Sequence, residues 1–367
     1  MQLCELINAM EAIAPSRYAE PWDNVGLLVG DPQQRISRVM LTIDYTPEVA
    51  CEAAGAGCDA VIAYHPPIFK PYLSRVTADG ASSLVFDAVK RGVAIYSPHT
   101  ALDVADGGTN DALADVLGLM DRRPLKLAEG KATQCKLVTF VPEDALAKVS
   151  EAIFRAGAGR IGNYSACSFR TIGTGTFYGE SGSNPTIGQS GRLETTSEVK
   201  LETIVPLANV EAVVRALREA HPFEEPAFDL NTLTALPEGV GIGRVGELPR
   251  PMSRADAIAA IKQELGLAQV LVSGPTDGDI HRAGVCAGAC GDLLDHAIGA
   301  GVQLYLTGEM RHHDALKAAR AGVTVVCTLH SNSERIALKR VARLLTQRLA
   351  ALPVMLSQQD RDAFAIG

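Results

Sequence analysis

The feature of this sequence that most constrains its fold is an alternation of short apolar runs with stretches of helical periodicity at both ends of the chain. In the first 120 residues, we expect strands at 39–43, 60–63 and 93–96 and helices at 48–56, 84–91 and 110–117. The same rhythm returns late, with expected strands at 283–287, 303–306 and 323–327 and helices at 254–265, 293–300, 314–321 and 333–349. Short strands that alternate with helices form βαβ units, so we expect an α/β domain with a mostly parallel sheet.

The middle of the chain has a different order of elements. Strands are expected at 136–142, 164–178, 199–205 and 227–233, and helices at 143–156 and 210–220, with 164–178 taken as one interrupted strand. This βαββαβ order is the split-βαβ or ferredoxin-like pattern. We therefore predict a ferredoxin-like α+β domain at 131–236, inserted between the two halves of the α/β domain at 1–130 and 237–367. Two cores also suit the length of 367 residues, because single cores stop growing at about 250–300 residues.

Net charge and cysteine content indicate which partners and which cellular compartment to expect for the protein. The formal net charge is −8, whereas binding to nucleic acid or to anionic membranes favours a basic face, so we expect neither partner. No apolar run approaches the about 20 residues that span a bilayer. The eight cysteines are scattered, with no C-x-x-C pair, and the N-terminus lacks the basic region of a signal peptide. Scattered thiols indicate a reducing compartment, so we expect a cytoplasmic protein.

Three of the expected strands each run into a histidine. These are His65, His99 and His330, and the carboxylates Asp103 and Glu334 follow the last two at a spacing of four residues. In open α/β sheets, functional groups collect at the carboxyl ends of strands, so we expect these side chains at one edge of the sheet. Imidazole with carboxylate is a ligand set for Zn, Mn, Fe or Co, whereas an all-oxygen set favours Mg or Ca.

The local sequence around two of these histidines also suits a metal site. Pro66 restricts His65 to an extended conformation, which holds the histidine at the exit of its strand. The spacing Ser331-x-x-Glu334 fits a capping box, which predicts a helix that begins at Ser331 with His330 and Glu334 on the same side of its start. From these residues alone, a metal centre and a set of hydrogen-bonded core or rim histidines remain open alternatives.

Four segments in combination resemble a known family. They are PWDNVGL at 21–27, YHPPIF at 64–69, SPHTALD at 97–103 and LHSNSER at 329–335. Together they resemble the Nif-three-like dinuclear-metal family, whose bacterial members are often labelled GTP cyclohydrolase 1 type 2 homologs. The segments GNYS at 162–165 and HPFEEP at 221–226 are similar to the PII/CutA-like module of its longer members. The resemblance covers nearly the whole chain.

The resemblance implies a centre of two divalent metal ions per subunit, of Zn, Fe, Mn or Co. The implied ligands are His65, Asp103, His330 and Glu334, with Glu334 touching both ions. Tyr64 stands where the commonest bacterial pattern has a first histidine, and it is a further candidate ligand, although a neutral phenol binds metal far less well than imidazole. The family also implies a homohexameric ring whose metal sites face an internal cavity.

The leading functional hypothesis is a metal-dependent hydrolase of a nucleotide or another phosphorylated small molecule, because a bound divalent ion activates water. His99 and Glu309 are the candidate catalytic residues, and Glu309 has with His312 the Glu-x-x-His spacing of di-metal helices. Residues 22–24 are candidates for lining a substrate cleft, and the glycine-rich turn at 288–291 for binding a phosphate. The alternatives are a non-enzymatic protein that senses, stores or escorts metal, and an interaction scaffold with a structural metal. A structural site is coordinatively closed, whereas a catalytic site keeps water on the metal.

Overall fold

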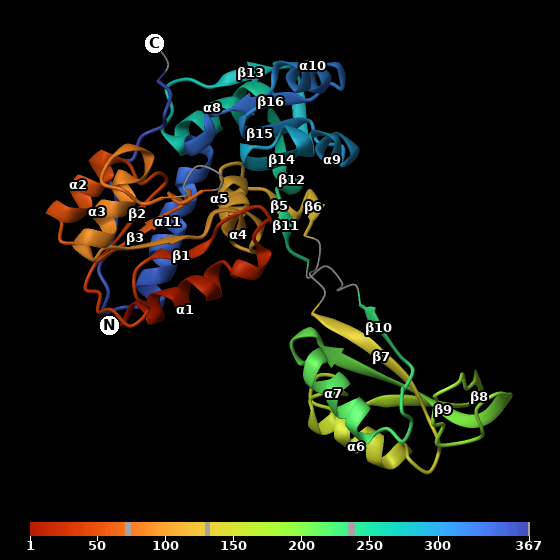
Figure 1. Cartoon of the computed structure of the whole chain (residues 1–367). Coiled ribbons are helices and arrows are strands. Elements are labelled where there is room, and N and C mark those ends of the chain that lie inside the picture. Colours follow the sequence, from red (N-terminus) through yellow and green to blue (C-terminus); the bar gives the residue numbers. More distant parts are fainter. Residues whose placement is uncertain (70–74, 129–132, 234–238, 366–367) are drawn as a thin grey trace. The chain divides into compact units, whose positions relative to one another are not determined.

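The computed structural model describes residues 1–69, 75–128, 133–233 and 239–365 (Figure 1). The chain divides into two compact units, one made of Met1–Ala128 with Pro237–Gly367 and the other of Glu129–Leu236. The domain boundaries expected at 130/131 and 236/237 fall outside the described residues. Each unit has its own β-structure and its own hydrophobic core.

The first unit contains two main sheets. The five-stranded sheet has the spatial order β1 (Gly26–Val29), β4 (Ala94–Ser97), β3 (Ala60–Ala63), β2 (Val39–Thr42) and β17 (Val354–Leu356). The six-stranded sheet has the order β13 (Leu271–Ser273), β16 (Thr324–Cys327), β15 (Leu304–Glu309), β14 (Asp279–Ala289), β12 (Arg244–Ser253) and β5 (Met120–Arg123). Two short strands, β6 (Lys126–Leu127) and β11 (Gly241–Ile242), pair with each other.

The expected parallel strands are present, but they lie in two sheets rather than one. Strands β17, β2, β3 and β4 are parallel neighbours, and so are β14, β15 and β16. The strands β1, β13, β12 and β5 add antiparallel pairings at the sheet edges. Hydrophobic periodicity identifies a strand but not its partner, so the sequence could not show that the strands are divided between two sheets. Nor could it show that each sheet takes one strand from the other half of the chain, β17 in the five-stranded sheet and β5 in the six-stranded sheet.

The helices of the first unit cover these sheets. They are α1 (Leu3–Ile13), α2 (Pro47–Gly55), α3 (Ser83–Arg91), α4 (His99–Val104), α5 (Thr109–Asp115), α8 (Arg254–Leu265), α9 (Leu294–Gly299), α10 (His312–Arg320) and α11 (His330–Arg348). Helix α11 contacts β2 and β17 of one sheet and β14 and β15 of the other, and Figure 1 shows it in blue between them. Its buried residues Ala337, Leu338, Val341 and Leu345 recur at helical spacing and join the core of the five-stranded sheet. One helix therefore links both sheets.

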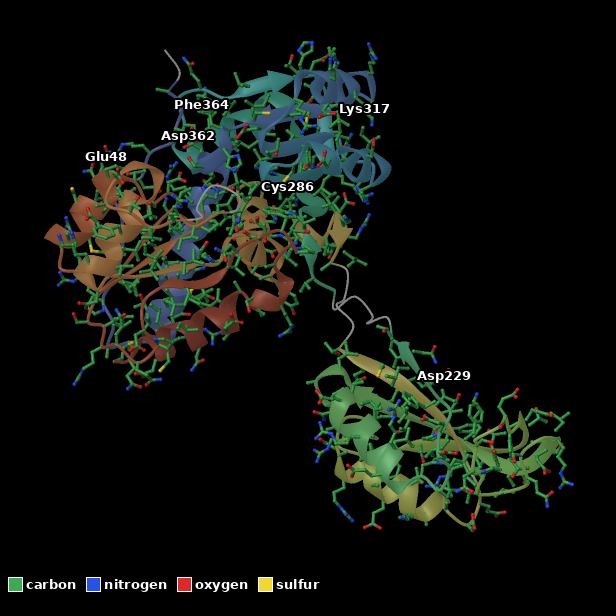
Figure 2. All side chains as sticks on the ribbon, in the orientation of Figure 1. Glu48, Asp229, Cys286, Lys317, Asp362 and Phe364 are labelled. Atoms are coloured by element: carbon green, nitrogen blue, oxygen red, sulfur yellow. A yellow bond between two sulfur atoms is a disulfide. The ribbon has the colours of Figure 1, made fainter. Side chains whose placement is uncertain are left out.

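The start of α11 differs from the expected capping box. The helix begins at His330, after Leu329 in a left-handed conformation with φ 70°. Both the backbone N–H and the hydroxyl of Ser331 donate to the carboxylate of Asp362, at 3.2 and 2.7 Å (Figure 2 labels Asp362). The prediction of a helix that starts at Ser331 was wrong, because a carboxylate from the C-terminal segment takes the place of the capping glutamate. Glu334 is thereby left for other contacts.

The second unit has the expected order of six elements. They are β7 (Gln134–Val141), α6 (Leu146–Arg155), β8 (Ser168–Tyr178), β9 (Leu193–Pro206), α7 (Val210–Ala220) and β10 (Phe228–Thr232). The antiparallel sheet has the order β10-β7-β9-β8, and β8 is one continuous strand. Both helices pack on one face of this sheet, around buried residues such as Leu137, Leu201, Ile153 and Leu217.

One pair of cysteines departs from the expectation of scattered thiols. Cys286 and Cys290 form a disulfide at the carboxyl end of β14, with their Cα atoms 6.0 Å apart (Figure 2 labels Cys286). The other six cysteines are free. In the described parts of the chain, the helices are too short or too polar to cross a membrane.

We expect residues 131–236 to fold when they are expressed alone. The hydrophobic core of the second unit is built entirely from side chains between Cys135 and Phe228, so the segment carries its own core. The isolated segment should show a cooperative unfolding transition in urea, followed by circular dichroism. A disordered spectrum without a transition would contradict the prediction.

Candidate metal centre

Three predicted ligands converge where the two sheets of the first unit meet. His65 follows β3 of the five-stranded sheet, whereas His330 follows β16 of the six-stranded sheet and opens α11. Glu334 lies one turn further along α11. The expectation that all the histidines share one sheet edge was wrong, because the site is assembled from the strand ends of two sheets. The ligand atoms of these three residues all lie within 4.8 Å of one another.

Glu334 occupies the middle of this cluster. Its side chain is 4% exposed, and its two carboxylate oxygens face different histidines. Oε1 lies 3.3 Å from Nε2 of His330, and Oε2 lies 3.3 Å from Nε2 of His65. The two imidazole rings are 5.4 Å apart between centroids. Two imidazole nitrogens therefore point at one buried carboxylate.

A second carboxylate orients each imidazole. Nδ1 of His65 lies 2.9 Å from Oδ1 of Asp44, and Nδ1 of His330 lies 2.5 Å from Oε1 of Glu309. Histidines that bind metal commonly use the other ring nitrogen in this way, which fixes the ring and the tautomer. Asp44 was not among the predicted site residues, although a carboxylate directly after the expected strand 39–43 was a signal for it. Glu309 contacts His330.

The carboxylates raise the pKa of both histidines. Burial by itself lowers the pKa of His65, but the hydrogen bond with Asp44 and the charge of Glu334 raise it to about 10. For His330, the interaction with Glu334 outweighs burial and raises the pKa to about 9. Burial would raise the pKa of Glu334, but the two imidazoles hold it below its ordinary value. The cluster therefore favours an ionised carboxylate and protonated imidazoles, and a metal ion that binds here must displace the imidazole protons, because only neutral imidazole is a ligand.

The residues fit a divalent metal ion. Oε2 of Glu334 is buried and is assigned no hydrogen-bond partner among the described residues, although Nε2 of His65 lies 3.3 Å away as an ion-pair partner. A buried charged oxygen without a donor is costly, and a bound cation would compensate it. Two imidazole nitrogens with a carboxylate form a ligand set for Zn, Mn, Fe or Co.

Asp103 and Tyr64 lie beside this cluster and bind each other. The Tyr64 hydroxyl donates to Oδ1 of Asp103 and lies 3.1 Å from the hydroxyl of Thr109. Burial and the charge of Glu334 raise the pKa of Asp103 to about 6. Burial and the neighbouring Asp103 raise the pKa of Tyr64 well above its ordinary value. Tyr64 is therefore a protonated hydrogen-bond donor that engages one oxygen of a predicted ligand.

His99 is held by Asp23 from the PWDN segment. Its Nδ1 lies 2.8 Å from Oδ1 of Asp23, whose other oxygen accepts from the backbone and the hydroxyl of Thr100. The Asp23 side chain is fully buried, and His99 has a left-handed φ of 26°. The His99 ring lies 5.3 Å from that of His65 and 6.1 Å from that of Trp22, which is 58% exposed. The segment at 22–24 thus positions His99 next to the cluster.

The glycine-rich segment at the carboxyl end of β14 approaches the same cluster. Gly288 has φ 73°, and a Cβ at this position would lie 3.0 Å from Oε1 of Glu334. Its backbone N–H donates to the hydroxyl of Ser333, so this donor is already used and is not free for a phosphate. The expected partner of Glu309, His312, is exposed at the start of α10, and its ring meets that of His313 edge to face, at 5.5 Å between centroids.

A buried carboxylate between two imidazoles, at the junction of two α/β sheets, defines an α/β protein with a candidate divalent-metal site. A family model, Duf34/NIF3 (NGG1p interacting factor 3), matches residues 1–363. The chain belongs to the DUF34/NIF3 family, which confirms the resemblance found in the sequence.

Relatives and solved structures agree with this assignment. A GTP cyclohydrolase 1 type 2 homolog of Halalkalibacterium halodurans is 36% identical over 363 residues, covering 98% of this chain and 97% of the relative. A homolog of the same name from Bacillus subtilis is 34% identical over 364 residues, covering 98% and 97%. The crystal structure of a Bacillus cereus protein related to NIF3 is 34% identical, with a TM-score of 0.68 and coverage of 100% and 99%. A Staphylococcus aureus crystal structure is 26% identical, with a TM-score of 0.78 and the same coverage.

We expect Gly288→Ala to destabilise the protein more than Gly322→Ala. Both glycines have nearly the same positive φ, 73° and 74°, so each substitution carries a conformational cost of about 1–2 kcal/mol. Only at Gly288 does the new Cβ meet a buried neighbour, since nothing lies within 4 Å at Gly322. Urea denaturation of both variants isolates the cost of this close approach. Equal losses of unfolding free energy in the two variants would show that a Cβ at position 288 does not clash with Glu334.

Proposed function

We propose that this protein is a metal-dependent hydrolase with a dinuclear divalent-metal centre, acting on a nucleotide or another phosphorylated small molecule. The observation that carries the proposal is the position of the buried Glu334. Its two carboxylate oxygens face different imidazoles, and Oε2 has no hydrogen-bond partner among the described residues. A carboxylate placed in this way suits a ligand shared by two ions. The names of the relatives, which are homologs of a GTP cyclohydrolase, support a nucleotide as the substrate.

The protein's own groups divide into ligands and groups that position them. His65, His330 and Glu334 would hold the metal, joined by Asp103 through the oxygen that Tyr64 does not engage. A divalent ion bound there would lower the pKa of its water toward about 7, which is the chemistry that hydrolysis needs. Asp44 and Glu309 keep the imidazoles in place.

His99 is the better of the two candidate catalytic residues. An ionised Asp23 accepts a hydrogen bond from Nδ1–H, which fixes the tautomer and leaves Nε2 available to exchange a proton with a substrate. The exposed ring of Trp22 lies beside it and provides an apolar wall for a planar group. Glu309, by contrast, is engaged with His330, so we assign it a positioning role.

We expect Glu334→Gln to lose most of the bound metal and His330→Ala to lose chiefly one ion. The amide of glutamine keeps the shape of the side chain but removes the charge that both ions would share, whereas His330 offers a single nitrogen. Metal per chain is measured by plasma mass spectrometry on protein loaded with Zn²⁺ or Mn²⁺, alongside the melting temperature. Glu211→Gln, an exposed substitution on α7, is the control and should keep full metal content. Unchanged metal in Glu334→Gln would contradict the dinuclear centre.

An activity screen separates the hydrolase from a metal store or escort. Metal-loaded protein is incubated with purine nucleotides, and hydrolysis is followed by chromatography, with Glu334→Gln and Asp23→Asn as comparisons. A hydrolase loses turnover in both variants, but Asp23→Asn keeps its metal because Asp23 contacts His99 and none of the three clustered ligands. Full metal content without turnover of any nucleotide would favour the storage or escort function.

We expect Tyr64→His to raise the metal content. The substitution supplies a neutral nitrogen in place of a phenol that burial keeps protonated, and it frees the oxygen of Asp103 that now accepts from the hydroxyl. Tyr64→Phe is the matched control, because it also frees Asp103 but adds no ligand. Metal stoichiometry that rises equally in both variants would assign the effect to Asp103 alone, and no rise in Tyr64→His would refute a ligand position there.

We also propose that the second unit is a ferredoxin-like, PII/CutA-like module and that the protein forms a homohexamer. The module is supported by its βαββαβ order and by the strand order β10-β7-β9-β8. The hexamer rests on the family resemblance alone, in which a closed ring restricts access to the metal sites. Light scattering should give six times the mass of the chain, and a stable monomer at micromolar concentration would overturn the proposal.

A further inference from the structure

The second unit contains a cavity of 610 Å³ on its extended β8–β9 ribbon. Its walls are the ribbon itself, the loop at 179–187 and the turn at 223–227. The loop is fastened to the turn, since the Thr186 hydroxyl donates to the carbonyl of Pro222 at 2.6 Å and the Asn184 N–H donates to Glu224 at 3.1 Å. The volume lies within the roughly 300–1,000 Å³ of small-molecule sites. Figure 1 shows α6 and α7 together on one side of the sheet, with the ribbon extending past them.

Glycines in β8 make room for an acidic side chain in this cavity. Gly173 is the cross-strand partner of Glu198 on β9. A Cβ at Gly175, two residues along the strand, would lie 2.7 Å from Oε2 of Glu198. Glycine inside a strand often marks such a close approach. The carboxylate of Glu198 therefore lies across β8, on the face that lines the cavity.

The charge of the lining is predominantly negative. Its charged residues are one lysine, Lys200, and four glutamates, Glu180, Glu198, Glu224 and Glu225. The ammonium of Lys200 is paired with Glu202, at 2.8 Å, and Glu224 accepts the N–H of Asn184. Glu198 has neither an ion pair nor a hydrogen bond within the described residues, and burial raises its pKa. A positively charged group of a ligand would therefore stabilise this partly buried carboxylate.

The remaining lining selects the kind of cation. Phe140, Phe177 and Phe223 contribute aromatic rings, and Ile187 adds apolar surface. Aromatic faces attract organic cations and also bind apolar groups. Among the described residues, the only acidic or histidine group that converges closely enough for a metal ion is the one in the first unit, so the glutamates of this cavity are too dispersed for a bare ion.

We propose that this cavity binds a small organic cation, an amine with an apolar body, whose ammonium group pairs with Glu198 while its apolar body packs on the phenylalanine rings. The site lies wholly within the second unit, and the proposal does not depend on the function proposed for the metal centre.

Three probes that share a phenylethyl body and differ in the head group test the choice of ligand on the full-length protein. Calorimetry compares 2-phenylethylamine, which is cationic, with neutral 2-phenylethanol and anionic 3-phenylpropionate. The amine should bind roughly tenfold more tightly than the alcohol, as expected for a hydrogen bond to a charged group, and the carboxylate should not bind. Equal affinities for amine and alcohol, or preferential binding of the carboxylate, would overturn the proposal without any substitution in the protein.

Two glutamate variants then locate the site. Glu198→Gln keeps the shape of the side chain and should weaken amine binding by roughly tenfold while leaving binding of the alcohol unchanged. Glu211→Gln removes a charge from an exposed residue of α7 outside the cavity and should bind the amine as the unmodified protein does. Circular dichroism verifies that both variants are folded. Amine affinity that is the same in Glu198→Gln and in the unmodified protein would refute the assignment.

Discussion

The approach of two imidazoles to one buried carboxylate is the interaction on which the rest of the first unit's site depends. Glu334 sits on α11, the helix that packs against strands of both sheets, so its position relative to His65 and His330 is set by the packing of that helix. A carboxylate with so little exposure is costly unless cations or hydrogen-bond donors surround it. The two sheets meet this demand by each contributing a histidine, and one carboxylate oxygen still lacks a donor among the described residues.

The histidines in and beside the cluster share one arrangement. Each histidine of the site has a carboxylate at its Nδ1, and the three pairs are His65 with Asp44, His99 with Asp23 and His330 with Glu309. Such partners hold an imidazole in one orientation and one tautomer, and Nε2 of His65 and of His330 faces Glu334. Gly288 packs closely against this group, since a Cβ there would lie 3.0 Å from Oε1 of Glu334. The imidazole rings that would bind metal or transfer a proton are therefore already oriented by their carboxylate partners.

The second unit has a hydrophobic core of its own. Its two helices cover one face of a four-stranded sheet, and its hydrophobic core needs no residue from the first unit. The long β8–β9 ribbon extends beyond that core, and its glycines and phenylalanines build the cavity that we assign to an organic cation. A unit with its own core can carry a binding site of its own, and every residue that lines this cavity belongs to the second unit.

The sequence by itself determined the elements and three of the residues that meet at the site. Strands such as β3 and helices such as α2 follow from apolar runs and turn residues, which are local properties, and strand ends pointed to His65, His330 and Glu334. Pairing is not local, so only the tertiary structure divided the strands between two sheets and brought Asp44 to His65. The C-terminal carboxylate that replaced the expected cap of α11 comes from a segment about thirty residues away, and periodicity carries no information about contacts at that distance.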